Sequence, residues 1–259
     1  MFKTLKKRFC KTLAFTLAET LIVMGIIGVV AALTIPNLNS STADKEKVAK
    51  LKKVYSNIND AIGRTEAVYG SLSDNFPSYN TYADRLGDFL KVSKTCGTST
   101  NQGCLSKEYK YLNGTAYTGH EAHGGNDTAS NVYKYILADG TGLGIAASTG
   151  IYYFVVDIDG PTKGSSTLGK DLFELYIIRP DSTYSALASE KKGILLSDIP
   201  ASNSSNTMLL DKTDLTENFK SGRGLATWVI QNDNMDYLKA TDGKCKNNVV
   251  LSWTNTSCK

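Results

Sequence analysis

The chain has 259 residues, of which 41% are hydrophobic and 21% charged, and this composition excludes a wholly disordered or collagen-like protein. Its net charge of +4 comes from residues 1–14, which hold five lysines and arginines and no acid, so the rest of the chain sums to −1. A broad basic surface is therefore not expected, and the charge pattern gives no support for nucleic acid as a partner.

A long apolar segment follows the basic leader. Residues 15–35 contain one charged side chain, that of Glu19, and as a helix they would be about 30 Å long, the thickness of a hydrocarbon core. This pattern predicts a transmembrane and assembly helix over residues 15–36. The cationic leader would stay in the cytoplasm and the C-terminal part of the chain would lie outside it. A simple signal anchor would have the same pattern.

Glu19 is the unusual residue of this segment. An ionised carboxylate among apolar residues is costly and usually has a partner. If residues 1–14 were removed, the free amino group of Phe15 would be the natural cation for it. The simpler interpretation is a glutamate near the membrane surface that reaches water.

The junction between leader and apolar segment resembles that of type IV prepilins and type II secretion pseudopilins. The residues that carry the resemblance are Lys11-Thr-Leu-Ala14 followed by Phe15-Thr-Leu-Ala-Glu19-Thr-Leu-Ile. It implies cleavage between Ala14 and Phe15 by a prepilin peptidase, N-methylation of Phe15, and use of Glu19 in subunit assembly. One departure is Ala14 itself, because the family usually has glycine before the cut.

The resemblance also implies a function. The chain would be a structural subunit of a type IV pilus or type II secretion pseudopilus, with no enzymatic activity and no required cofactor. Its partners would be other pilin or pseudopilin subunits, the prepilin peptidase/methylase and a membrane-embedded assembly platform. It would cross the cytoplasmic membrane once, with its head outside the cytoplasm, before joining the fibre. The alternative is a membrane-anchored extracytoplasmic binding module, similar to an adhesin, that forms no fibres.

Small residues recur along the apolar segment. Ala18, Gly25 and Ala32 are seven residues apart and Gly28 lies on a neighbouring turn, so another helix could approach closely along this stripe. Small residues are also frequent in membrane helices generally. Pro36 is expected to kink or loosen the helix.

Beyond Pro36 the sequence predicts an amphipathic helix over residues 37–69 and a loop-rich head over residues 70–259. An apolar stripe at i, i+4, i+7 and i+11 marks the helix: Leu51, Tyr55, Ile58 and Ile62. The head is expected to contain a short helix over 82–92 and an antiparallel meander, because β-branched and aromatic runs alternate with glycine turns. The predicted strands are 132–137, 143–147, 151–156 and 172–178.

The predicted fold class is therefore α+β. A long N-terminal transmembrane and amphipathic helix would pack on a small antiparallel β-sheet head, which the resemblance identifies with the pilin fold.

Four cysteines lie outside the leader, and three pairings of them are possible. The simplest joins the nearest partners, Cys96 with Cys104 and Cys245 with Cys258, which close short loops. Disulfides suit an exported head. Neither pair has the close spacing of a structural zinc site.

A loop over residues 156–173 is similar to one in pseudopilin-type heads. Asp157, Asp159 and Asp171 could supply oxygen ligands to a Ca²⁺ ion, which prefers carboxylates and backbone carbonyls. Asx turns that bond their own backbone are the simpler explanation.

Two further stretches imitate chemical motifs. Residues 164–171 nearly fit a P-loop, but Asp171 stands where the hydroxyl ligand for Mg²⁺ is needed. His120 and His123 lie in a glycine-rich loop that lacks the order of a zinc protease motif. Neither stretch predicts nucleotide or zinc binding. A hydrolase is not predicted either, because the sequence shows no recognisable set of catalytic residues.

Overall fold

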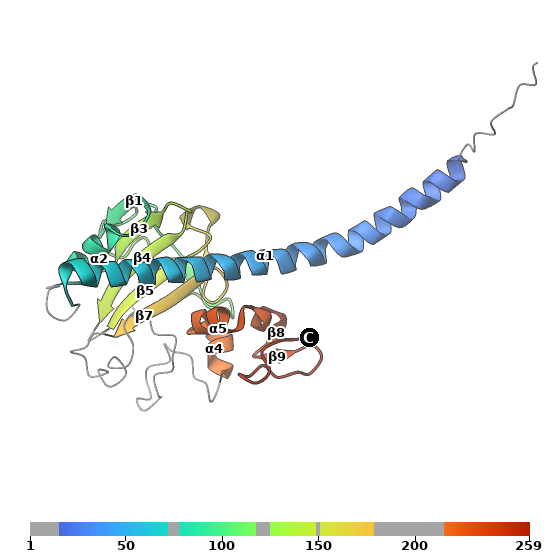
Figure 1. Ribbon diagram of the computed structural model, residues 1–259. Helices are drawn as coiled ribbons and strands as arrows, with labels where there is room; N and C mark the ends of the chain where they lie inside the picture. The colour runs from blue at the N-terminus through green and yellow to red at the C-terminus, as the bar shows by residue number, and fades with distance from the viewer. Residues whose placement is uncertain (1–15, 72–77, 118–124, 149–150, 179–214) are drawn as a thin grey trace, which may run out of the picture. The chain divides into compact units, whose positions relative to one another are not determined.

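The computed structural model describes most of the chain (Figure 1). The described residues are 16–71, 78–117, 125–148, 151–178 and 215–259, with the side chains of 33–41 excepted. Contacts divide the chain into two units, Met1–Ala43 and Asp44–Lys259. Helix α1 (Leu17–Tyr69) contributes to both, and each unit is described separately.

In the first unit, α1 is not the transmembrane helix that the sequence predicts. None of the helices formed by the described residues combines the length and the apolar content that crossing a membrane requires. The predicted fold class, with a transmembrane helix over residues 15–36 as its first part, is therefore wrong.

The second unit is built on a five-stranded antiparallel sheet. Its strand order is β1-β3-β4-β5-β7, and neighbouring strands are antiparallel throughout. The strands are β1 (Val92–Gly97), β3 (Tyr133–Leu137), β4 (Gly142–Ser148), β5 (Ile151–Asp157) and β7 (Leu172–Ile178). Four of these confirm the predicted strands, since β-branched and aromatic residues fill β3, β5 and β7 and a glycine-containing turn separates β3 from β4.

The edge strand β1 differs from the sequence prediction. The expected helix over 82–92 is instead α2 (Tyr79–Gly87), which starts where the Ser78 side chain accepts a hydrogen bond from the Thr81 amide. The chain is extended again from Val92, and β1 pairs with β3. Along β1 only Cys96 is buried, so its sequence lacks the apolar alternation that would reveal a strand.

The second part of α1 supplies one side of the core. Leu51, Val54 and Ile58 have no exposed surface and belong to one apolar cluster with sheet residues such as Phe154 and Leu175. Figure 1 shows α1 crossing the face of the sheet. The apolar stripe that the sequence shows over this region is therefore the stripe that packs on the strands.

The C-terminal part of the second unit is a set of short elements around Trp228, which is fully buried. Its ring packs edge-on against Phe219, at 5.3 Å between centroids, and at the same distance from Trp253. The elements are α4 (Thr216–Ser221), α5 (Leu225–Asn232), η2 (Asp236–Lys239), β8 (Ala240–Thr241) and β9 (Lys244–Cys245). Between β5 and β7 lie η1 (Pro161–Lys163) and β6 (Ser166–Thr167), which pairs in parallel with β2 (Tyr109–Lys110).

Both predicted disulfides are confirmed. Cys96 is bonded to Cys104 and Cys245 to Cys258, with Cα atoms 6.3 and 5.5 Å apart. The second bond closes the C-terminal tail onto β9.

Asp236 also holds this tail. Its carboxylate accepts hydrogen bonds from the Ser257 hydroxyl (2.7 Å), the Cys258 amide (3.0 Å) and the Lys239 ammonium (2.6 Å). Burial alone would raise the pKa of Asp236, but these hydrogen bonds from the tail and from Lys239 outweigh it and lower the pKa below its usual value of 3.8.

Replacing Leu51 should test the packing of α1 on the sheet. We expect Leu51→Ala to lower the free energy of unfolding by about 2–5 kcal/mol, because it leaves a cavity in the core. Ser56→Ala, on the exposed side of the same helix, should change it by less than about 0.5 kcal/mol. Urea unfolding measures both. Equal effects would mean that α1 does not pack on the sheet through this stripe.

Asp236 should make a pH-dependent contribution to stability. Because its pKa is lowered in the folded state, the contribution is present above about pH 4 and is lost as the pH falls through the folded pKa. We expect Asp236→Asn to be less stable than the unmodified chain at pH 7, with the difference shrinking towards pH 3. Thermal unfolding at a series of pH values measures the difference, and a gap that does not depend on pH would contradict the assignment.

Candidate assembly surface

The apolar residues at the start of α1 are exposed on all sides of the helix. Their side chains keep 54–82% of their surface exposed, and they are Leu17, Leu21, Ile22, Val23, Met24, Ile26, Ile27, Val29 and Val30. We call residues 17–32 the apolar helix segment. A helix that is apolar all round is normally buried against other apolar groups, and a patch of this size marks an interaction surface.

Glu19 is engaged at the first turn of α1. Its Oε2 accepts hydrogen bonds from the Thr16 amide and the Thr16 hydroxyl, both at 2.9 Å. The Glu19 amide donates in return to the Thr16 hydroxyl oxygen at 3.2 Å. This reciprocal pair is a capping box, in which a threonine and a glutamate three residues later satisfy the free amides of a helix start.

The capping box gives Glu19 a role that the sequence analysis missed. Its signal, Thr16-x-x-Glu19 just before an apolar run, can be read directly in the chain. The predicted cleavage site, Ala14 and Phe15, and the predicted methylation site at Phe15 lie outside the described residues. The structure therefore shows Glu19 bonded within its own chain, to the residue that follows Phe15.

The small residues of the segment leave open space. A Cβ atom added at Gly25 or Gly28 would meet nothing within 4 Å. Ala18 and Ala32 are exposed on the same helix. Pro36 lies where the side chains are not described, and α1 is assigned as helix on both sides of it. The surface of the segment is therefore free for another helix to approach.

The three aspartates proposed for Ca²⁺ are used within the protein. Asp157 is fully buried and accepts hydrogen bonds from the hydroxyls of Ser106 and Ser166, both at 2.9 Å, and from the Gly160 amide at 3.1 Å. Burial raises the pKa of Asp157 in spite of these bonds. Its oxygens fasten the loop that follows β5.

Asp159 and Asp171 face a lysine. The Lys47 ammonium lies 3.4 Å from an Asp159 oxygen and 3.8 Å from an Asp171 oxygen. The next turn of α1 adds a second lysine, because Lys50 donates to the Ile158 carbonyl. Within the described part of the chain no group of three or more histidine, cysteine or acidic side chains is arranged to hold a metal ion. Lys47 and Lys50 of α1 therefore lie where the sequence suggested a Ca²⁺ ion.

The P-loop-like stretch is a folded connection. The Leu168 amide donates to the Lys110 carbonyl and the Gly169 amide to the Leu172 carbonyl, both at 2.8 Å. These amides are therefore not free to bind phosphate. His120 and His123 lie outside the described residues.

A buried polar cluster on the head was not foreseen. Glu174 on β7, 9% exposed, accepts hydrogen bonds from the hydroxyls of Tyr117 (2.5 Å) and Tyr176 (2.8 Å). The Arg223 guanidinium lies 5.6 Å from the ring of Tyr111 and 5.9 Å from that of Tyr117. Burial is the main cause that raises the pKa values of both tyrosines bonded to Glu174. Tyr117, Glu174 and Arg223 are distant from one another in sequence, so no local pattern could have grouped them.

Comparison with known proteins gives no family assignment: no family model, curated protein or solved structure matches this chain.

Removing Lys47 should leave its two aspartates without their shared cation. We expect Lys47→Met to lower the free energy of unfolding by about 1–3 kcal/mol at pH 7. Burial already raises the pKa of Asp171, so protonation should relieve part of this loss as the pH is lowered to 5. Lys52→Met is the matched control, because the Lys52–Asp233 pair is exposed and should contribute less than about 1 kcal/mol. Equal losses for the two variants would contradict the role given to Lys47.

Proposed function

We propose that this chain is a structural subunit of an extracytoplasmic fibre, of the type IV pilus or type II secretion pseudopilus kind, and that it assembles through its apolar helix segment. The observation that carries the proposal is the exposure of that segment. Nine large apolar side chains are at least 54% exposed between residues 17 and 30. Each contributes about 1.5–3 kcal/mol when it moves from water to an apolar environment, so a packed bundle of such helices is strongly favoured.

The chemistry of the segment suits association between copies of one helix. Gly25 and Gly28 leave room for close approach, and dispersion contacts and small residues dominate helix packing where both surfaces are apolar. The proposed partners are other pilin or pseudopilin subunits, a prepilin peptidase/methylase and a membrane-embedded assembly platform. In this proposal the subunit is held at the cytoplasmic membrane with its head outside the cytoplasm, and then enters the fibre.

We propose that Glu19 makes assembly depend on removal of the leader. Inside a bundle its carboxylate would lose water and would need a cation. The amino group of Phe15 on a neighbouring subunit would supply that cation, but only after the leader has been removed. The Thr16 hydrogen bonds satisfy the carboxylate until then. They need not be broken when the cation arrives, because both go to Oε2 and leave Oε1 to accept another.

Processing is the first test of this proposal. We expect the mature chain to begin at Phe15 and to carry an added methyl group on its amino terminus. Intact-mass measurement and N-terminal sequencing of membrane-extracted protein check both. A mature chain that still begins at Met1 would contradict the proposed processing.

Assembly is the second test. We expect Glu19→Ala to give a folded, processed subunit that enters fibres poorly, and Glu19→Gln to recover only part of the loss because it lacks the charge. Sheared-fibre fractions, compared with the membrane pool, measure the incorporation. Glu46→Ala changes another exposed glutamate of α1 and should assemble normally.

A second variant separates assembly from helix capping. Thr16→Ala removes the hydroxyl that takes part in the capping box but keeps the Glu19 carboxylate, so it should enter fibres far better than Glu19→Ala. If both variants fail equally, Glu19 acts through the capping box. If Glu19→Ala assembles like the unmodified chain, the carboxylate has no role in assembly.

A further inference from the structure

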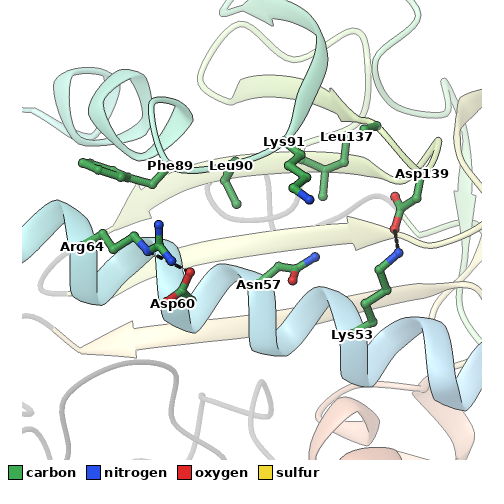
Figure 2. Close-up of a pocket in the computed structure, with 10 residues that line it drawn as sticks. Lys53, Asn57, Asp60, Arg64, Phe89, Leu90, Lys91, Leu137 and Asp139 are labelled. Carbon is green, nitrogen blue, oxygen red and sulfur yellow. Dashed lines mark ion pairs between the residues drawn. The ribbon is translucent and has the colours of Figure 1, made fainter.

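A pocket in the second unit lies between α1 and the chain segment that joins α2 to β1. Figure 2 shows that α1 lines one side, that residues 89–91 line the other, and that the end of β3 closes the back. Its volume is about 380 Å³, at the lower end of the range for small-ligand sites. The lining residues are Lys53, Asn57, Asp60, Arg64, Phe89, Leu90, Lys91, Leu137, Ala138 and Asp139.

The walls of the pocket are fixed by the fold. The Lys91 carbonyl accepts a hydrogen bond from the Ala138 amide at 2.8 Å, and the Val92 amide donates to the Leu90 carbonyl at 3.0 Å. The side chains of Leu90 and Leu137 are buried in the core cluster beneath. The pocket is therefore preformed, which lowers the entropy lost when a ligand binds.

Two ion pairs occupy the ends of the pocket. Lys53 lies 3.6 Å from an Asp139 oxygen, and Arg64 lies 3.0 Å from an Asp60 oxygen. The third cation of the lining, Lys91, belongs to neither pair. The lining residues therefore carry a net charge of +1.

Two solvent-exposed polar side chains lie in the middle of the pocket. Neither the Lys91 ammonium nor the Asn57 side-chain amide forms a hydrogen bond or ion pair with any residue that the structure describes. In Figure 2 both side chains extend into the space between α1 and the end of β3. At the Arg64 end of the pocket, away from these two side chains, lies the half-buried ring of Phe89, which packs edge-on against Tyr69 at 6.3 Å between centroids.

We propose that this pocket binds a hydroxylated carboxylate of monosaccharide size, of the uronic acid class. Lys91 would pair with the carboxylate in a charge-assisted hydrogen bond. Asn57 can both donate to and accept from hydroxyl groups, and Asp60 and Asp139 can accept from them.

This inference goes beyond the proposed fibre and does not depend on it, because every residue of the pocket belongs to the second unit. The same chemistry has two sources, a free uronic acid and a unit of an acidic polysaccharide. A head that holds such a unit would attach the protein to an acidic polysaccharide, whereas a free acid would be a captured solute.

The test is a titration of the full-length protein in nonionic detergent, followed by NMR. The probes are sodium galacturonate, neutral galactose, and trigalacturonate. We expect galacturonate to shift the resonances of Asn57, Phe89 and Lys91 saturably, with a Kd on the order of 1 mM, and galactose to bind at least tenfold more weakly. Trigalacturonate binding more tightly than the monomer would indicate the polysaccharide, and equal or weaker binding would indicate the free acid.

Variants tie the binding to the pocket. Lys91→Met should raise the Kd about tenfold or more, whereas Lys91→Arg should keep most of the affinity. Asn57→Ala should weaken binding although the net charge of the pocket stays the same. Lys107→Met changes an exposed lysine outside the pocket and should have no effect. The proposal is overturned if neither acid binds saturably, if galactose binds as well as galacturonate, or if Lys91→Met and Asn57→Ala both leave the Kd unchanged.

Discussion

The apolar surface of α1 completes the core of the second unit. Over residues 48–62 its apolar side chains are buried, and they complete the core against the sheet. Over residues 17–30 the same helix carries large apolar side chains that are more than half exposed. Removing apolar surface from water is worth about 25 cal/mol per Å², so burial of this exposed part, which no described residue of the chain covers, would be strongly favoured.

The head is fastened to α1 by charge as well as by packing. Lys47 and Lys50 reach from the helix to the loop after β5, where Asp157 is already held by two serines. At the other end of the sequence, Asp236 and the Cys245–Cys258 bond hold the tail. These contacts hold the described loop after β5 and the C-terminal tail against the apolar core.

Local patterns in the sequence predicted the local parts of this structure. The runs that form β3, β5 and β7 are β-branched and aromatic and are separated by glycine turns, so their extended conformation could be read directly. The disulfide pairs joined the nearest cysteines, because short loops close most readily. The capping box of Thr16 and Glu19 is equally local, because it depends only on a threonine followed three residues later by a glutamate.

What depended on distant contacts could not be predicted. The Glu174 carboxylate meets a tyrosine 57 residues away, and Lys47 meets aspartates more than 100 residues along the chain. An aspartate in a glycine-rich loop has the same local sequence whether it faces calcium or a lysine, so only the fold distinguishes the two. The transmembrane prediction is also wrong, because no helix formed by the described residues combines the length and the apolar content that crossing a membrane requires.

The central claim is that the apolar helix segment becomes buried against other copies in a fibre. A single cysteine at Ile22 tests it most directly, because the four cysteines of the head are already paired. Thiol labelling of Ile22→Cys should be fast in detergent-extracted subunits and slow in sheared fibres, where a short bismaleimide should cross-link neighbouring subunits. A cysteine at Lys107, exposed on the head, gives the reference labelling rate in both states. If Ile22→Cys is labelled in fibres as fast as in free subunits and forms no cross-link, the segment is not the assembly surface.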